Sequence, residues 1–341
     1  MRYANAAAVV AFVVAGILAR PSTGSAPPEP VEGQSTSPFS HEYADVNGVR
    51  LHYARAGNGP LIVFLHGFPE FWYEWKNQLV EFSRDHTAVA PDMRGYNLSS
   101  KPADLSAYQV PQLVEDVRAL TGELMKPAGG SKFTLVAHDW GGVVAWVFAA
   151  LHPDLLDKLV IVNAPHPTIF GKLLQQDAAQ QKASGYMLMF RSPQAEATLS
   201  ANSYALLTSM VLGDGLKAGT VTEADKAAYL EAWSQPGALT GGLNYYRAAG
   251  VGPPTAASTA STETGSAPPA APPALPPLVV RVPTLVIWGE KDTALLTANL
   301  DGLDEVVTKL TIRRVPDGTH WVVREKPAEV NRLIREFLAQ P

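Results

Sequence analysis

The stretch TLVAHDWGG, residues 134–142, joins an apolar run to a tight turn flanked by small residues. A strand that ends in such a turn, with a helix after it, is the arrangement of a nucleophile elbow, which usually carries serine or cysteine at its tip. Here the tip residue is Asp139. The stretch therefore predicts a buried strand, a sharp turn and a helix, with a carboxylate where a hydroxyl or a thiol normally lies.

Apolar runs and helical patterns alternate along the chain on both sides of this turn. Their alternation predicts an α/β fold, with a mostly parallel sheet that is covered by helices on both faces. Two short alternating runs around Asn47-Gly48 predict a hairpin. The other strands are expected within residues 61–67, 86–100, 132–139, 156–165, 284–292 and 309–321, and helices within residues 110–124, 141–153 and 328–338.

Two segments interrupt this alternation. Residues 168–250 have a mostly helical period and no clear strand, which predicts an inserted helical cap. Residues 251–277 are rich in proline and alanine and carry a single charge, Glu263, so we expect a flexible loop that buries no core. The α/β core is therefore expected to be discontinuous, over residues 41–167 and 278–341.

The N-terminus has a different composition from the rest of the chain. Arg2 precedes an uncharged apolar run from residue 6 to residue 19, which Arg20 follows. Such a run is shorter than the roughly 20 residues that span a bilayer and is typical of a signal-peptide core. Residues 1–20 are predicted to be a signal peptide that directs export to the periplasm or medium, with an uncleaved membrane anchor as the alternative. Residues 21–40 are expected to be a disordered linker.

Composition excludes several classes of function. The chain has 341 residues and a net charge of -5, which provides no basic field for nucleic acid. It has no cysteine, so disulfides, iron–sulfur clusters and a thiol nucleophile are excluded. Neither zinc-type spacing nor a phosphate-binding glycine motif is present, and we expect no metal and no cofactor. The oligomeric state is left open.

An aspartate at an elbow suits one kind of chemistry. Its carboxylate can attack a saturated carbon and form an alkyl ester, which a base-activated water then hydrolyses. Unlike the hydroxyl of a serine, a carboxylate needs no base to become a nucleophile, so a base is needed only for the second step. Asp292 and His320 each follow a predicted strand and complete the order nucleophile, acid, base. Glu290 is the alternative partner for His320.

An oxyanion hole is expected from two backbone N–H groups. One belongs to Trp140, directly after the nucleophile, and the other to Phe68, because the next residue, Pro69, has no N–H. His66 and His138 flank these turns. We interpret both as buried residues that stabilise the turns, since neither completes a triad.

Several separate motifs agree in order and spacing with one family. The chain resembles the soluble-type epoxide hydrolases of the α/β-hydrolase superfamily, from about residue 42 to the C-terminus and excepting the proline-rich segment. The motifs that carry the resemblance are HGFPEFWYEW (66–75), DMRGYNLSSKP (92–102), HDWGG (138–142), NAPHP (163–167), WGEKD (288–292) and GTHW (318–321).

The resemblance implies that a small-molecule epoxide and water are the reactants and that two cap tyrosines donate hydrogen bonds to the epoxide oxygen. Tyr186, in GYMLMFRSP, and Tyr246, just before an arginine, occupy the matching positions. Tyr245 is the alternative to its neighbour. Tyr204 and Tyr229 are interpreted as packing residues.

The substrate is expected to lie against Phe68 and Trp140 as well as against the two tyrosines. Asn97 stands where relatives often have glycine, which we interpret as a loop variation away from the chemistry. Haloalkane and haloacid dehalogenases use the same triad and remain the alternative. However, haloalkane dehalogenases bind the leaving halide with ring N–H donors, and fluoroacetate dehalogenases tend to have arginine at the position of Trp140. A binding protein without activity would be expected to lack part of the triad.

Overall fold

The computed structural model describes residues 38–126, 130–255 and 278–341. The predicted signal segment and nearly all of the predicted linker lie outside these residues, as does most of the proline-rich segment. Over the described ranges, no helix combines the length and apolar character needed to cross a membrane.

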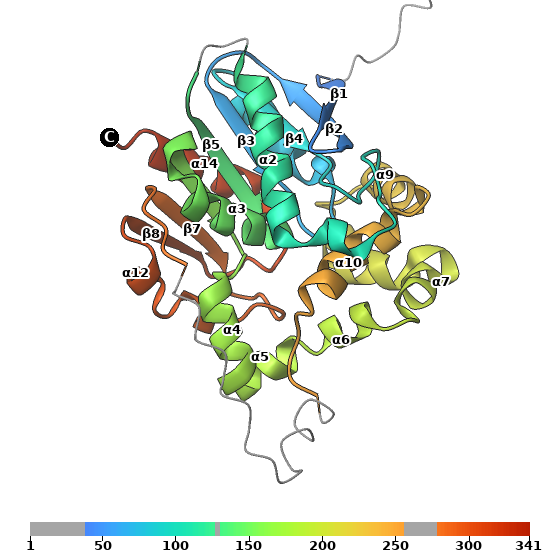
Figure 1. Cartoon of the computed structure of the whole chain (residues 1–341). Coiled ribbons are helices and arrows are strands. Elements are labelled where there is room, and N and C mark those ends of the chain that lie inside the picture. Colours follow the sequence, from blue (N-terminus) through green and yellow to red (C-terminus); the bar gives the residue numbers. More distant parts are fainter. Residues whose placement is uncertain (1–37, 127–129, 256–277) are drawn as a thin grey trace, which may run out of the picture. The chain divides into compact units, whose positions relative to one another are not determined.

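A central sheet organises the described part of the chain (Figure 1). Its spatial order is β1-β2-β4-β3-β5-β6-β7-β8. Strand β2 runs antiparallel to β1 and β4, and the remaining pairs are parallel, which confirms the predicted mostly parallel sheet and the hairpin. The strands are β1 (Ser40–Val46), β2 (Val49–Ala56), β3 (Leu61–Leu65), β4 (Thr87–Pro91), β5 (Phe133–His138), β6 (Leu156–Val162), β7 (Thr284–Gly289) and β8 (Leu310–Val315).

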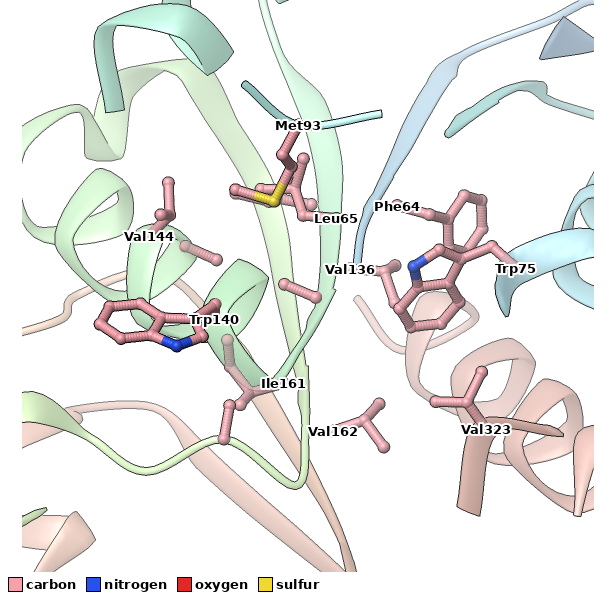
Figure 2. Close-up of a cluster of buried hydrophobic side chains, with 14 of the residues drawn as sticks. Phe64, Leu65, Trp75, Met93, Val136, Trp140, Val144, Ile161, Val162 and Val323 are labelled. Carbon is pink, nitrogen blue, oxygen red and sulfur yellow. The ribbon is translucent and has the colours of Figure 1, made fainter. Parts of the chain in front are cut away.

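The inner strands are apolar throughout because both of their faces are covered. Every residue of β3, β4, β5 and β7 is buried. Successive side chains of a strand point to opposite faces. Figure 2 shows this for Phe64, which lies with Trp75 and Val323 on one face, and for Leu65, which lies on the other face with Trp140.

Helices cover both faces of the sheet, as predicted. Helices α2 and α3 pack together on one face, and α13 and α14 pack together with α1 on the other. The core helices are α1 (Lys76–Phe82), α2 (Val110–Met125), α3 (Asp139–Leu151), α12 (Leu303–Val306), α13 (Val322–Glu325) and α14 (Pro327–Leu338), with short 3₁₀ turns η1 (Trp72–Trp75), η2 (Leu105–Tyr108), η4 (Pro153–Leu155) and η7 (Thr297–Leu300).

Among the described residues between β6 and β7, a set of helices without any named strand occupies the interval for which the sequence predicts a cap (Figure 1). Helix α7 contains a kink at Asn202, Ser203 and Tyr204, whose φ angles are 50°, 56° and 62°. We refer to these helices as the cap helices, and they are α4 (Pro167–Gln176), α5 (Ala178–Ala183), α6 (Tyr186–Arg191), α7 (Ala195–Leu207), the π-helical turn η5 (Thr208–Leu212), α8 (Gly213–Ala218), α9 (Glu223–Ser234) and α10 (Ala238–Ala249).

Candidate active site

Asp139 lies at the turn between β5 and α3. Its φ of 48° is a strained value for a residue with a side chain, as expected of a nucleophile elbow. The Phe68 N–H donates to Asp139 Oδ1 at 2.8 Å. This approach requires a glycine at Gly67, because a Cβ there would lie 2.3 Å from the carboxylate. Trp140 is in the first turn of α3, where backbone N–H groups have no acceptor within the helix.

His320 lies between two carboxylates. Its Nδ1 is 2.7 Å from Asp292 Oδ2, and its Nε2 is 3.7 Å from Asp139 Oδ2. Glu290 instead pairs with the exposed Arg314, so the structure brings Asp292 rather than Glu290 to the histidine. The three residues of the predicted triad therefore lie together at the carboxyl ends of β5, β7 and β8.

Asn163 is part of this site and was not predicted. It follows β6, and its Nδ2 donates to Asp292 Oδ2 at 2.9 Å and to the Gly289 carbonyl at 3.2 Å. Its Oδ1 accepts from the Gly289 N–H at 2.7 Å. Asp292 Oδ1 accepts two further bonds, from the N–H groups of Ala294 and Leu295. The only sequence signal was an amide side chain directly after a buried strand, within NAPHP.

The charges of the site depend on these contacts. Burial disfavours the charged form of His320, but the carboxylates of Asp292 and Asp139 outweigh burial and raise the pKa of His320 to about 9. Burial acts in the opposite direction on the pKa of Asp292, which the charge of His320 and the hydrogen bonds to the carboxylate nevertheless lower. In the resting site, His320 is therefore an imidazolium at neutral pH.

The two predicted cap tyrosines line the same cavities as Asp139. Tyr186 belongs to α6 and Tyr246 to α10, and their ring centroids are 6.4 Å apart. Burial first, and then the charge of Asp139, raise the pKa of each phenol well above 10, so both remain hydrogen-bond donors. Tyr245 faces away from the site and donates to the Arg94 carbonyl at 2.8 Å.

Two cavities meet at Asp139, and Asp139, Tyr186 and Tyr246 line both. The larger has a volume of about 250 Å³ and the smaller about 80 Å³. We call them the large arm and the small arm. The large arm is also lined by Trp140, Val143, Pro167, Phe170, Leu174 and Met187, and the small arm by Phe68, Phe190, Leu207, Met210, His320 and Trp321.

The two flanking histidines are buried and bound to the backbone. His66 Nε2 accepts from the Met93 N–H at 3.0 Å, and its Nδ1 lies 2.8 Å from the Gly67 carbonyl, which fixes a neutral tautomer. His138 Nε2 lies 2.9 Å from the His320 carbonyl. Burial lowers the pKa of both rings to about 4.

Three other residues singled out in the sequence have defined contacts. Asn97 has a φ of 36°, a value that glycine adopts without strain, and its Nδ2 donates to the buried Asp92 at 2.8 Å. Tyr204 donates to a backbone carbonyl at 3.3 Å. Tyr229, expected only to pack, also donates to Glu70, which pairs with Arg324.

No metal centre accompanies this site in the described parts of the chain. Their histidine, aspartate and glutamate side chains form no group of three or more that could hold a metal ion.

Known proteins are similar to this chain in sequence and in fold. The family described as "alpha/beta hydrolase fold" matches residues 60–327. The chain is 38% identical to the AB hydrolase superfamily protein YfhM of Bacillus subtilis over 87% of this chain and 97% of that protein. It is 34% identical to mouse epoxide hydrolase 4 over 86% of this chain and 77% of that protein. A Bacillus megaterium epoxide hydrolase variant, crystallised with its product (R)-3-[1]naphthyloxy-propane-1,2-diol, superposes with a TM-score of 0.77 at 37% identity, covering 88% of this chain and 100% of that one.

The fold and the elbow define the class, an α/β-hydrolase that carries aspartate in place of serine. The chain belongs to the α/β-hydrolase family and, within it, to the epoxide hydrolases.

Proposed function

We propose that the enzyme converts an epoxide to a vicinal diol through a covalent ester on Asp139. The observation that carries the proposal is that the two carboxylate oxygens of Asp139 have different contacts. Oδ1 accepts a hydrogen bond from the Phe68 N–H, whereas Oδ2 faces His320 at 3.7 Å, and Asp139 lines both cavities. Oδ2 is therefore the oxygen that attacks an epoxide carbon and breaks its C–O bond, and Oδ1 becomes the carbonyl oxygen of the ester.

The epoxide oxygen carries the electron pair of the broken bond and remains attached to the substrate. Tyr186 and Tyr246 are placed to hydrogen-bond this oxygen and to supply its proton, since their pKa values keep them protonated. The tyrosine that gives up its proton regains one at the expense of the proton that His320 carries in the resting site, so the ester, the alcohol and a neutral His320 result. Ester formation removes the charge of Asp139, one of the two carboxylates that hold this proton on the imidazole.

Neutral His320 then serves as the base for hydrolysis. It takes a proton from water, and the hydroxide attacks the ester carbonyl carbon. The negative charge that develops on Oδ1 is bound by the N–H groups of Phe68 and Trp140. Collapse of this intermediate breaks the bond to the substrate, and the diol takes the proton from His320. The carboxylic acid left on residue 139 then passes its proton to His320, which restores the Asp139 carboxylate and the protonated imidazole.

A halide substrate fits the site less well. A leaving halide needs ring N–H donors that face the nucleophile. The Trp140 ring instead packs edge-to-face against the Tyr246 ring, with centroids 5.1 Å apart, and the two phenols that line both cavities suit an oxygen as the leaving atom.

The scheme is tested by replacing His320 with glutamine. The first step needs no base, so His320→Gln should form the ester but fail to hydrolyse it. Exposure to an epoxide such as styrene oxide should add the mass of one substrate molecule to the intact protein, as read by mass spectrometry. If the variant gives no adduct while the native enzyme converts the same epoxide to diol, the covalent scheme is wrong.

We also propose that residues 1–20 direct export of the protein. It is supported by the uncharged run between Arg2 and Arg20, which is short for a membrane span. Cell fractionation and N-terminal sequencing of the mature protein test it. A protein that keeps its first 20 residues in the membrane fraction would support an anchor instead.

A further inference from the structure

Glu74 is a buried carboxyl group that the mechanism does not use. It belongs to η1 and is only 3% exposed. Its Oε1 lies 2.5 Å from Nδ1 of His138, the residue before the nucleophile. Neither this Nδ1 nor the other carboxyl oxygen, Oε2, has an aligned hydrogen-bond partner in the described structure. Buried polar atoms rarely remain unpaired, so the protons of this pair need to be located.

The opposite side of the His138 ring fixes one proton. Its Nε2 lies 2.9 Å from the His320 carbonyl, and a carbonyl oxygen can only accept. Nε2 therefore carries a hydrogen. A neutral imidazole has a single N–H, so Nδ1 presents a lone pair to Glu74. Two lone pairs would repel at 2.5 Å, and one proton must lie between Glu74 and Nδ1.

The charged and titratable groups around this pair decide which partner keeps the proton. They are Glu70 in the loop after β3, Asp139 at the start of α3, His320 in the loop after β8, and Arg324 on α13. Burial raises the pKa of Glu74 to about 8, with Arg324 and His320 opposing the rise and Asp139 adding to it. Burial and the charge of His320 lower the pKa of His138 to about 4, against the effects of Asp139 and Glu70. The proton therefore belongs to Glu74.

We propose that Glu74 is a neutral carboxylic acid in the resting enzyme and is a positioning residue, which donates its proton to His138 and, through the His138 ring, holds the main chain of His320 in place. The inference rests on the role proposed for His320.

This arrangement has two effects on the catalytic histidine. The bond from His138 reaches the carbonyl of His320 itself, and the two rings lie 4.7 Å apart, so the tautomer of one ring helps to place the other. A neutral Glu74 also keeps a third negative charge away from His320. When Glu74 ionises at alkaline pH, that charge should hold the proton on His320 and reduce the neutral base needed for hydrolysis.

Infrared difference spectroscopy tests the protonation state without any turnover. The native enzyme minus Glu74→Gln should show the carbonyl stretch of a protonated carboxylic acid at neutral pH, and this band should disappear as the pH rises through about 8. Glu290→Gln, which changes a glutamate paired with Arg314 at the surface, should leave the band intact. If no protonated-acid band is lost in Glu74→Gln, the proposal is overturned.

Kinetics test the positioning role. A glutamine amide can donate to Nδ1 but cannot ionise, so Glu74→Gln should match native kcat at neutral pH. Glu74→Ala leaves Nδ1 unpaired and should lower kcat by about tenfold or more. The charge of an ionised Glu74 should raise the pKa of His320 by about one unit. At alkaline pH the native rate should therefore fall below that of Glu74→Gln by up to about tenfold.

Superimposable pH profiles of the native enzyme and Glu74→Gln would overturn the proposal that Glu74 gains a negative charge at alkaline pH. If Glu74→Ala does not fold, the infrared band and the pH profile of Glu74→Gln still decide. Absence of diol formation from every epoxide would refute the proposed function and leave the infrared result standing.

Discussion

At the scale of single residues, the proposed chemistry follows from how each oxygen of Asp139 is bound. A serine at this turn would need a base before it could attack, whereas a carboxylate can attack directly. In the proposed scheme, the first product is an ester on the protein itself, which must then be hydrolysed. The scheme assigns that second step to His320 and the first step to the cap phenols.

The cap phenols distinguish epoxide chemistry from halide chemistry. Changing Tyr186 and Tyr246 together to phenylalanine removes the donors and keeps the rings, so packing should survive. General acid catalysis is commonly worth about 10²- to 10⁴-fold, and the double variant should lose epoxide turnover on that scale. Either single variant should retain part of it. Steady-state diol formation measures the loss, with Tyr204→Phe as the control. Full activity in the double variant would make both tyrosines packing residues.

The raised pKa of His320 predicts how stability depends on pH. Its pKa is about 9 in the folded site and 6.5 ordinarily, so the folded state binds the proton more tightly. The contribution of the His320 imidazolium to stability is fully present below about 6.5 and is lost as the pH rises through about 9. Urea unfolding of the native enzyme and of His320→Gln measures it. The difference in free energy of unfolding should shrink over this window, and a difference that grows would contradict the assignment.

At the scale of elements, the sequence was sufficient where the signal is local. The apolar run before Asp139 and the order of Asp292 and His320 predict both the strands and the triad, because parallel strands end at one edge of a sheet. Asn163 and Glu74 escaped prediction for a physical reason. Their partners come from distant strands and turns, so nothing in the neighbouring sequence distinguishes them from ordinary polar residues.

Helix α3 depends on close contact with the strand beside it. A Cβ on Gly141 would lie 2.4 Å from the Leu65 carbonyl and 2.5 Å from the His66 carbonyl, both rigid backbone atoms. Gly141→Ala should therefore push α3 and the nucleophile out of place, with a loss of stability and of turnover. Gly122, in α2, has open space at the same position and is the matched control.

Replacing Gly122 with alanine should stabilise the protein by about 0.5–1 kcal/mol, because alanine is the better helix former. Thermal unfolding and diol formation compare the two variants. Equal stability of Gly141→Ala and the native enzyme would show that α3 does not pack against the Leu65 and His66 backbone as described.

At the scale of the whole described fold, hydrogen bonds join the cap helices to the same edge of the sheet at which Asp139 lies. Trp233 donates its indole N–H to the Pro69 carbonyl at 2.6 Å, and Tyr245 donates to the Arg94 carbonyl. Arg324 of α13 binds Glu70 in the loop after β3 and the Val211 carbonyl of η5. These contacts set the distance between cap and core, and with it the size of each arm of the cavity.

The unequal arms predict which epoxides the enzyme accepts. An engineered protein cavity of about 150 Å³ holds one benzene molecule. The large arm, at about 250 Å³, has room for an aryl group, whereas the small arm, at about 80 Å³, has not. An epoxide with one phenyl and one methyl substituent, trans-1-phenylpropylene oxide, should therefore react faster than trans-stilbene oxide, which has a phenyl group on each carbon.

Leu207 provides the test of this selectivity because it lines the small arm, whereas Leu199, on the same helix, is equally buried and lines neither arm. Leu207→Ala should raise kcat/KM for trans-stilbene oxide relative to trans-1-phenylpropylene oxide by about tenfold or more, since pocket contacts of one or two methylene groups are worth about 1–3 kcal/mol. Leu199→Ala removes the same atoms, lowers stability in the same way and should leave the ratio unchanged. Equal rates for the two epoxides in the native enzyme would mean that the small arm opens during turnover and does not select the substrate.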